Sequence, residues 1–276
     1  MIKTNKLFKS ITSFKGLFGL FTFFLFLILL SCQQDDFEQD FILDMNGIKS
    51  SVTSDMVNKT KGKLKDIEDN VYKTIKIGKQ WWMAENLKTT MYNDGTPIPY
   101  FDDNLEWKGI STPAYCWYDN EESTYKATYG ALYKWQTVNT GKLCPKGWHV
   151  PSDAEWKILE MYLGMTQEQS DMEGPRGAPA GGKLKETGLD YWWEPNFGAT
   201  NETGFTALPG GVHVGIPSEN DFSGIGEVGC WWSSTPFFYG SDLVDAWKRF
   251  TSYGEANIGR DHPSIMDGLS VRCLKD

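Results

Sequence analysis

Residues 143–163, LCPKGWHVPSDAEWKILEMYL, constrain the fold of this chain more than any other stretch. Ser152 is a favourable N-cap residue, and Glu155 three positions later completes a capping box that satisfies backbone N–H groups of the first turn. Apolar residues then recur at steps of three and four, as in one buried stripe: Trp156, Leu159 and Leu163. The spacing predicts an amphipathic helix over about residues 153–163.

The segment immediately before this helix carries two residues that can do chemistry. Cys144 suits a disulfide to a distant strand better than a role as nucleophile. His149 invites a catalytic interpretation, but it alternates with Trp148 and Val150 along the chain. We therefore interpret His149 as a strand residue whose ring is bonded to a neighbouring side chain.

Residues 1–31 have the pattern of a secretory signal peptide. Four lysines and no acidic residue are followed by an apolar run over residues 17–30. That run is too short and too poorly flanked for a stable membrane span. It ends in LLSC at residues 29–32, which resembles a bacterial lipobox and implies a lipid on Cys32. The alternative is a cleaved signal with a cysteine at its border by chance.

Residues 32–69 are polar and charged without a sustained period, which predicts a flexible acidic tether. The run QQDDFE at 33–38 resembles the acidic export signal of surface lipoproteins in Bacteroidetes, and a merely solvated tether is the alternative. The formal net charge of −9 argues against nucleic acid as a partner. We expect an outer-membrane lipoprotein, exposed on the cell surface, whose membrane contact is the lipid at Cys32.

Residues 70–276 are expected to form the folded domain. Residues 71–77 alternate, Gly78-Lys79 is a two-residue turn, and residues 80–83 return, which predicts a β-hairpin. Residues 129–135 are predicted to be helical, and residues 268–274 to be the last strand. Short elements, long loops and 12 Trp indicate an α+β domain.

Four cysteines lie in this domain: Cys116, Cys144, Cys230 and Cys273. An even number of cysteines in an exported domain indicates disulfides. Four cysteines allow three pairings, and the residues alone leave the choice open.

Six runs in a fixed order resemble one family: IGKQWWMAENLKTT, YGALYKWQTV, LCPKGWHVPSDAEW, GFTALPGG, CWWSST and LSVRCLKD. Together they are similar to the Fibrobacter succinogenes major paralogous domain, which is common in lipoproteins of Bacteroidetes and Fibrobacteres. The resemblance spans about residues 71–276. It implies a C-type-lectin-like fold with two helices, a small twisted antiparallel sheet, long loops and adjacent terminal strands. It implies no particular biochemical activity.

The resemblance also bears on the cysteines. In that fold the cysteine before the main helix usually meets one on the final strand, which implies a Cys144–Cys273 disulfide. Cys116 and Cys230 are then left as the second pair. Each of these two lies next to a Trp, as suits a buried bond.

Glu194-Pro195-Asn196 is similar to a triplet with which mannose-type C-type lectins bind calcium and sugar hydroxyls together. Those lectins also need a Trp-Asn-Asp run on the following strand, and this chain has none. A plain loop turn is therefore the favoured interpretation of the triplet. We expect no cofactor, with calcium as the alternative.

Two tryptophan pairs, Trp192-Trp193 and Trp231-Trp232, are further candidates for sugar binding. Strand alternation turns one member of each pair inward and can leave the other exposed for stacking on a sugar ring. Core packing is the expected role of most of these residues. The candidate ligand-binding residues are Glu194, Asn196, Trp193, Trp231 and Trp232.

We therefore expect a non-catalytic surface protein that binds a glycan or another surface protein. The first alternative is a structural or adhesive protein without sugar specificity. The second is an oxidative modifying enzyme, because residues 149–156 resemble a segment of formylglycine-generating enzymes. Those enzymes need two reactive thiols at close spacing, whereas Cys230 and Cys273 lie far apart in the sequence.

Overall fold

The predicted amphipathic helix is present as α5 (Asp153–Tyr162), and it begins with the predicted capping box. The Ser152 hydroxyl accepts from the backbone N–H of Glu155, and the Glu155 carboxylate accepts from the backbone N–H of Ser152 at 2.8 Å. Trp156 and Leu159 are completely buried, so the apolar stripe faces the core.

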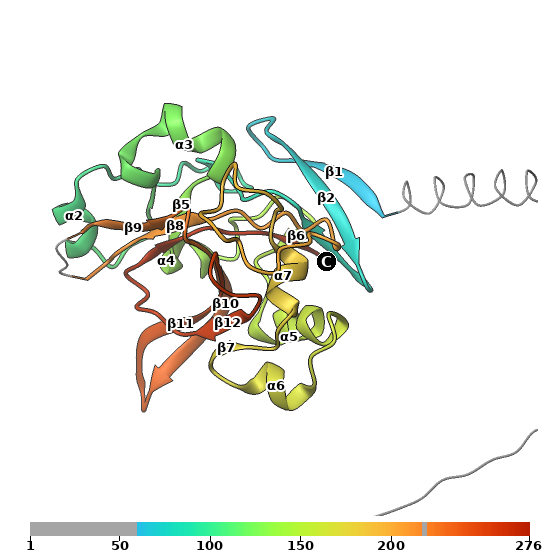
Figure 1. Cartoon of the computed structure of the whole chain (residues 1–276). Helices are drawn as coiled ribbons and strands as arrows, with labels where there is room; N and C mark the ends of the chain where they lie inside the picture. Colours follow the sequence, from blue (N-terminus) through green and yellow to red (C-terminus); the bar gives the residue numbers. More distant parts are fainter. Residues whose placement is uncertain (1–59, 217–219) are drawn as a thin grey trace, which may run out of the picture. The chain divides into compact units, whose positions relative to one another are not determined.

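The computed structural model describes residues 60–216 and 220–276 (Figure 1). The expected signal peptide, Cys32 and most of the expected tether lie outside the described residues. Within the described ranges, no helix is both long enough and apolar enough to cross a membrane.

The strands form three sheets, all of whose pairings between named strands are antiparallel. The first has the order β1 (Lys61–Lys65), β2 (Val71–Ile77), β3 (Gln80–Met83), β14 (Leu274–Lys275) and β6 (Trp148–His149). The second has the order β10 (Val228–Tyr239), β11 (Asp242–Ser252), β12 (Ile258–Asp261) and β7 (Gly174–Arg176). The third has the order β4 (Tyr115–Cys116), β5 (Leu132–Lys134), β13 (Gly268–Leu269), β8 (Gly210–His213) and β9 (Phe222–Ile225).

The helices are short, and α5 is the longest of those described. The others are α2 (Asn104–Gly109), α3 (Glu122–Tyr129), α4 (Trp135–Val138), α6 (Gln167–Asp171), α7 (Ala180–Leu184) and the 3₁₀ helix η1 (Tyr118–Asn120). Figure 1 shows α5 and α6 beside the sheet formed by β10, β11, β12 and β7. The described part of the chain is thus α+β, as predicted, with more helices than the two that the resemblance implies.

The first sheet brings the two ends of the domain together. Its predicted hairpin is confirmed, because β2 and β3 pair from Ile77 and Gln80 outward around the turn. β14 pairs with β3 on one side and with β6 on the other. Next to β14, the predicted disulfide between Cys144 and Cys273 is confirmed, with the two Cα atoms 5.9 Å apart.

Three sequence-based expectations about elements are wrong. Residues 268–274, expected to form one last strand, divide between β13 in the third sheet and the start of β14 in the first. Residues 61–65, assigned to the tether, form the edge strand β1, in which three exposed lysines alternate with Gly62 and Leu64. Residues 129–135, expected to be helical, contain strand β5, and helix α4 begins only at Trp135. Tyr133 and Leu132 pair with β4 there, and this tertiary pairing overrides the local preference.

Strand β10 is buried on both of its faces where it crosses the centre of the domain. Trp231 belongs to a cluster with Trp82, Trp156 and Phe205. Trp232 belongs to a second cluster on the other side, which also contains both half-cystines. A strand with a core on each side has no solvent-facing row of side chains.

Candidate functional site

An exposed aromatic segment follows α7, and we call residues 189–197 the aromatic loop. Its large apolar side chains are unusually accessible: Leu189 is 56% exposed, Tyr191 41%, Trp193 54% and Phe197 59%. The neighbouring Glu194 is exposed as well. Clustered exposed apolar side chains with polar neighbours are typical of interaction surfaces.

The Trp193 ring is held in place although it is exposed. Its backbone N–H donates to the Gly226 carbonyl at 2.9 Å, and its indole lies against Gly226, where a Cβ would collide with the ring. The Tyr253 ring meets it edge-on, with centroids 6.1 Å apart. A preorganised ring loses little conformational entropy when a ligand stacks on it.

The aromatic loop is anchored from beneath by three buried side chains. The Trp192 indole donates to the Ala207 carbonyl at 3.0 Å. Asn196 is 6% exposed, and its amide donates to two backbone carbonyls upstream in the chain. The Lys185 ammonium donates to the carbonyls of residues 197, 252 and 255, at 3.0, 2.8 and 2.9 Å. Burial lowers the pKa of Lys185 to about 8.

The predicted binding roles of Trp231 and Trp232 are wrong. The two residues are 1% and 0% exposed, because β10 has a core on each side. Their indole N–H groups donate to Asn86 Oδ1 and to the Tyr133 carbonyl. The alternation argument holds only for the other pair, in which Trp192 is buried and Trp193 is exposed.

Glu194 and Asn196 do not present their side chains to one ligand. Glu194 is exposed, whereas the Asn196 amide turns inward to the backbone. The plain-turn interpretation of the triplet therefore fits better than a calcium site. Among the described residues, no group of three His, Cys, Asp or Glu side chains is placed to hold a metal ion.

A groove, which we call the basic groove, runs between the chain after β3 and helix α3. Its enclosed part has a volume of about 230 Å³, and Tyr191 of the aromatic loop lines it together with Lys73, Glu85, Asn86, Lys88, Thr128 and Thr206. An open depression of about 600 Å³ continues it and is also lined by Lys88, with Lys126 and Glu122. The aromatic loop and the basic groove thus adjoin at Tyr191.

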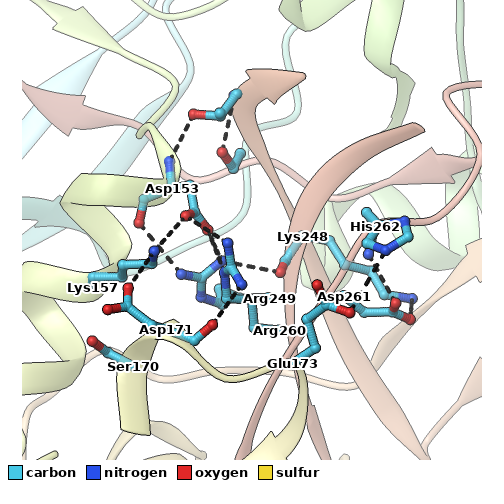
Figure 2. Close-up of polar contacts among 12 residues, drawn as sticks. Asp153, Lys157, Ser170, Asp171, Glu173, Lys248, Arg249, Arg260, Asp261 and His262 are labelled. Carbon is cyan, nitrogen blue, oxygen red and sulfur yellow. Dashed lines mark hydrogen bonds and ion pairs between the residues drawn. The ribbon is translucent and has the colours of Figure 1, made fainter. Parts of the chain in front are cut away.

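A buried ion network holds α5 against the second sheet (Figure 2). Arg249 donates to Asp153 at 2.8 Å and to Glu160 at 2.5 Å. Arg260 of β12 also donates to Asp153, and Arg176 of β7 to Glu160, each at 2.8 Å. Burial alone raises the pKa of Asp153, but hydrogen bonding to Arg260 and the charge of Arg249 outweigh it and hold this pKa well below its usual range.

The chain matches one known protein family over most of its length. The family model described as Fibrobacter succinogenes major domain matches residues 75–275. The chain belongs to this family. Searches of the curated proteins and of the solved structures found no significant match. The function of the family is not established.

The three histidines of this Fibrobacter succinogenes major domain lie in separate places, each with a side-chain partner. His149 is a strand residue, as predicted, and its ring bonds to Asp276 and Glu155. His213 is buried and bonds to Asn104. The third ring, of His262, stacks on Phe237 at 3.7 Å and bonds to Asp245 at 2.9 Å.

The predicted Cys116–Cys230 disulfide is wrong, and both residues are free thiols. The Cys230 side chain belongs to the cluster that contains the disulfide, whereas the Cys116 side chain packs in a different hydrophobic cluster. Cys116 is 0% exposed and Cys230 is 4% exposed, and burial raises the pKa of each. Burial therefore shields both thiols from solvent and favours their protonated form.

Sequence reasoning missed several residues of the candidate surface in this Fibrobacter succinogenes major domain. Tyr191 and Phe197 flank the predicted Trp193-Glu194 pair, so an aromatic count over residues 189–197 could have found them. Lys88 and Tyr253 come from distant parts of the chain. No local signal in the sequence places either one beside the aromatic loop.

Proposed function

We propose that the domain is a non-catalytic carbohydrate-binding module whose contact surface is the aromatic loop. The observation that carries this function is the exposed, preorganised ring of Trp193, which packs on Tyr253 and is 54% accessible. Aromatic faces bind the apolar faces of sugar rings, and neighbouring polar groups orient the hydroxyls. Glu194 is exposed beside this ring.

Rigidity supports binding at this loop. Asn196, Trp192 and Lys185 fix the loop backbone from below through hydrogen bonds to carbonyls. A surface that is already ordered before the ligand binds loses less conformational entropy on binding, so its affinity is higher. The exposed rings therefore form a better ligand platform than a loose loop of the same composition.

Trp193→Ala should reduce glycan affinity at least tenfold, because exposed aromatic anchors carry a large share of binding free energy. The measurement is binding of the purified domain to a glycan array, followed by titration of the best ligand. Tyr162→Ala removes another exposed ring, 63% accessible on α5, and should leave affinity unchanged. Chelation of calcium should also have no effect, since Glu194 and Asn196 do not converge.

Two results would remove the carbohydrate function. One is an array on which no sugar binds above background, with and without calcium. The other is equal affinity of the Trp193→Ala and Tyr162→Ala variants for every ligand. The structural or adhesive alternative would then replace the proposed function.

The proposal includes a C-type-lectin-like architecture for the domain. It is supported by the pairing of β3 with β14 and by the disulfide between the segment before α5 and the residue that precedes β14. Long loops, including residues 185–209, separate the short elements. Superposition of an experimental structure on a C-type-lectin-like domain would test this assignment directly.

The proposal also places the module outside the cell on a lipid anchor. Its support is the apolar run at 17–30 followed by LLSC at residues 29–32. Cells grown with labelled palmitate should incorporate label into the wild-type chain and not into Cys32→Ala, whereas Cys230→Ala should keep the label. Digestion by protease added to intact cells should then show surface exposure. Label retained in Cys32→Ala would contradict the anchor.

A further inference from the structure

The basic groove is positively charged although the chain as a whole is acidic. The formal net charge of the chain is −9. Lys73, Lys88 and Lys126 line the groove and its open continuation, against the two carboxylates of Glu85 and Glu122. An excess of positive charge on an acidic protein marks a place where an anion is favoured.

Lys88 is the cation best placed to meet a ligand. It lines both the enclosed part of the groove and the open part. Its ammonium lies over the Tyr72 ring, 5.5 Å from the centroid. Within residues 60–216 and 220–276, no carboxylate lies in ion-pair distance of it. By contrast, Lys73 is paired with Glu85 at 3.9 Å and Lys126 with Glu122 at 2.7 Å, so Lys88 carries the excess positive charge of the groove.

A second positive charge lies beneath the groove. Arg272 is 1% exposed and donates to Asn86 Oδ1 at 2.9 Å and to the Thr206 carbonyl at 2.7 Å, both residues that line the groove. It also donates to the Phe205 carbonyl. All three acceptors are neutral, so no carboxylate cancels the guanidinium charge by direct contact. The Glu85 carboxylate of the groove offsets part of this charge through space, and the remainder contributes a positive potential to the floor.

The groove has the size of a single sugar residue. Its enclosed volume of about 230 Å³ is below the usual range for drug-sized ligands, about 300–1,000 Å³. Tyr191 forms one wall, and the side chains of Thr128 and Asn86 add polar groups. Tyr191 and Trp193 are two residues apart, which limits their Cα separation to about 7 Å. One chain of linked sugars can therefore reach both rings.

We propose that the basic groove is a subsite for one negatively charged sugar residue of a glycan whose neighbouring residue stacks on Trp193. This inference rests on the proposed function and specifies its ligand as an acidic polysaccharide. The Lys88 ammonium contacts the negative group of the sugar directly. The buried Arg272 guanidinium adds positive electrostatic potential from beneath the groove. The negative group is a carboxylate or a sulfate, both of which a lysine ammonium binds as a point charge.

The test compares acidic glycans with neutral parents of the same backbone. The probes are an oligogalacturonate and its fully methyl-esterified form, and dextran sulfate and dextran. We expect at least one acidic probe to bind at least tenfold more tightly than its neutral parent, with an affinity that falls as salt is raised. Preference within the first pair identifies a carboxylate as the ligand group, and preference within the second identifies a sulfate.

Matched lysine variants assign that preference to the groove. Lys88→Gln should weaken binding of the acidic probe about five- to tenfold and leave the neutral parent unaffected. Lys79→Gln removes the same charge from the exposed turn between β2 and β3 and should behave as wild type. Thermal unfolding of Lys79→Gln should match wild type, because Lys79 is exposed and makes no ion pair within the described residues. Lys88→Gln should unfold at only a slightly lower temperature, because it loses the contact of its ammonium with the Tyr72 ring.

Two outcomes would overturn the subsite. In the first, a neutral glycan binds through Trp193 as tightly as its acidic counterpart, which leaves the carbohydrate function intact. In the second, Lys88→Gln and Lys79→Gln weaken acidic binding equally, which shows a general effect of net charge. Failure of every probe and of the glycan array together would overturn the proposed function as well.

Discussion

Replacing Cys144 and Cys273 together by alanine should lower the free energy of unfolding by about 4–5 kcal/mol. The two residues are 129 positions apart, and in the chain-entropy model a cross-link over a loop of that length removes roughly 5 kcal/mol of unfolded-state entropy. For a domain of this size the midpoint of thermal unfolding should fall by about 10–15 °C. The measurements are denaturant titration and calorimetry of the purified domain.

The control for this prediction is Cys230→Ala. Cys230 lies in the same buried cluster as the disulfide but forms no bond, so its variant reports loss of packing alone. Reductant should destabilise both wild type and Cys230→Ala, and should have no effect on the double variant. A double variant as stable as Cys230→Ala would show that the cross-link contributes little.

Glu160→Gln should lower the free energy of unfolding by about 3–5 kcal/mol, the range expected when one partner of a buried ion pair is removed. Glu160 is 0% exposed and contacts Arg176 and Arg249 through both carboxylate oxygens. Glutamine has the same shape, but it leaves the Arg176 guanidinium without a carboxylate partner. Its amide also has two N–H donors that cannot pair with guanidinium donors.

Two comparisons separate this effect from general loss of charge. Asp171→Asn removes a half-exposed carboxylate that pairs with Lys157 at 2.7 Å, and should change stability little, because solvent screens that pair. The double variant Glu160→Gln/Arg176→Met should be less destabilised than the sum of its single variants. Additive effects, or a Glu160→Gln protein as stable as Asp171→Asn, would contradict the network as a source of stability.

Sequence reasoning predicted the parts of the fold that local chemistry encodes. The capping box at Ser152 and the turn at Gly78-Lys79 depend on neighbouring residues alone, and both are present. The Cys144–Cys273 bond came from family resemblance. The β1 strand was missed although Lys61, Lys63 and Lys65 alternate with Gly62 and Leu64, a pattern suited to an edge strand.

The failed predictions concern burial, which depends on elements that are distant in the sequence but pack together in the fold. Trp231 and Trp232 could not both be placed inside from the sequence, because alternation assumes one solvated face of a strand. Lys185 and Arg272 are buried with neutral oxygen partners, whereas composition alone assigns such residues to the surface. The candidate surface was therefore predicted only at Trp193 and Glu194.

The position of β14 between β3 and β6 has a consequence for how the protein is made. Leu274 pairs with Trp82 and His149, so the first sheet stays incomplete until almost all of the domain has left the ribosome. The first strands of this sheet cannot reach their final paired arrangement during synthesis. Strand pairing between residues so far apart in the sequence is also slow. This delay would suit the export proposed above, because a chain must be unfolded to be threaded across a membrane.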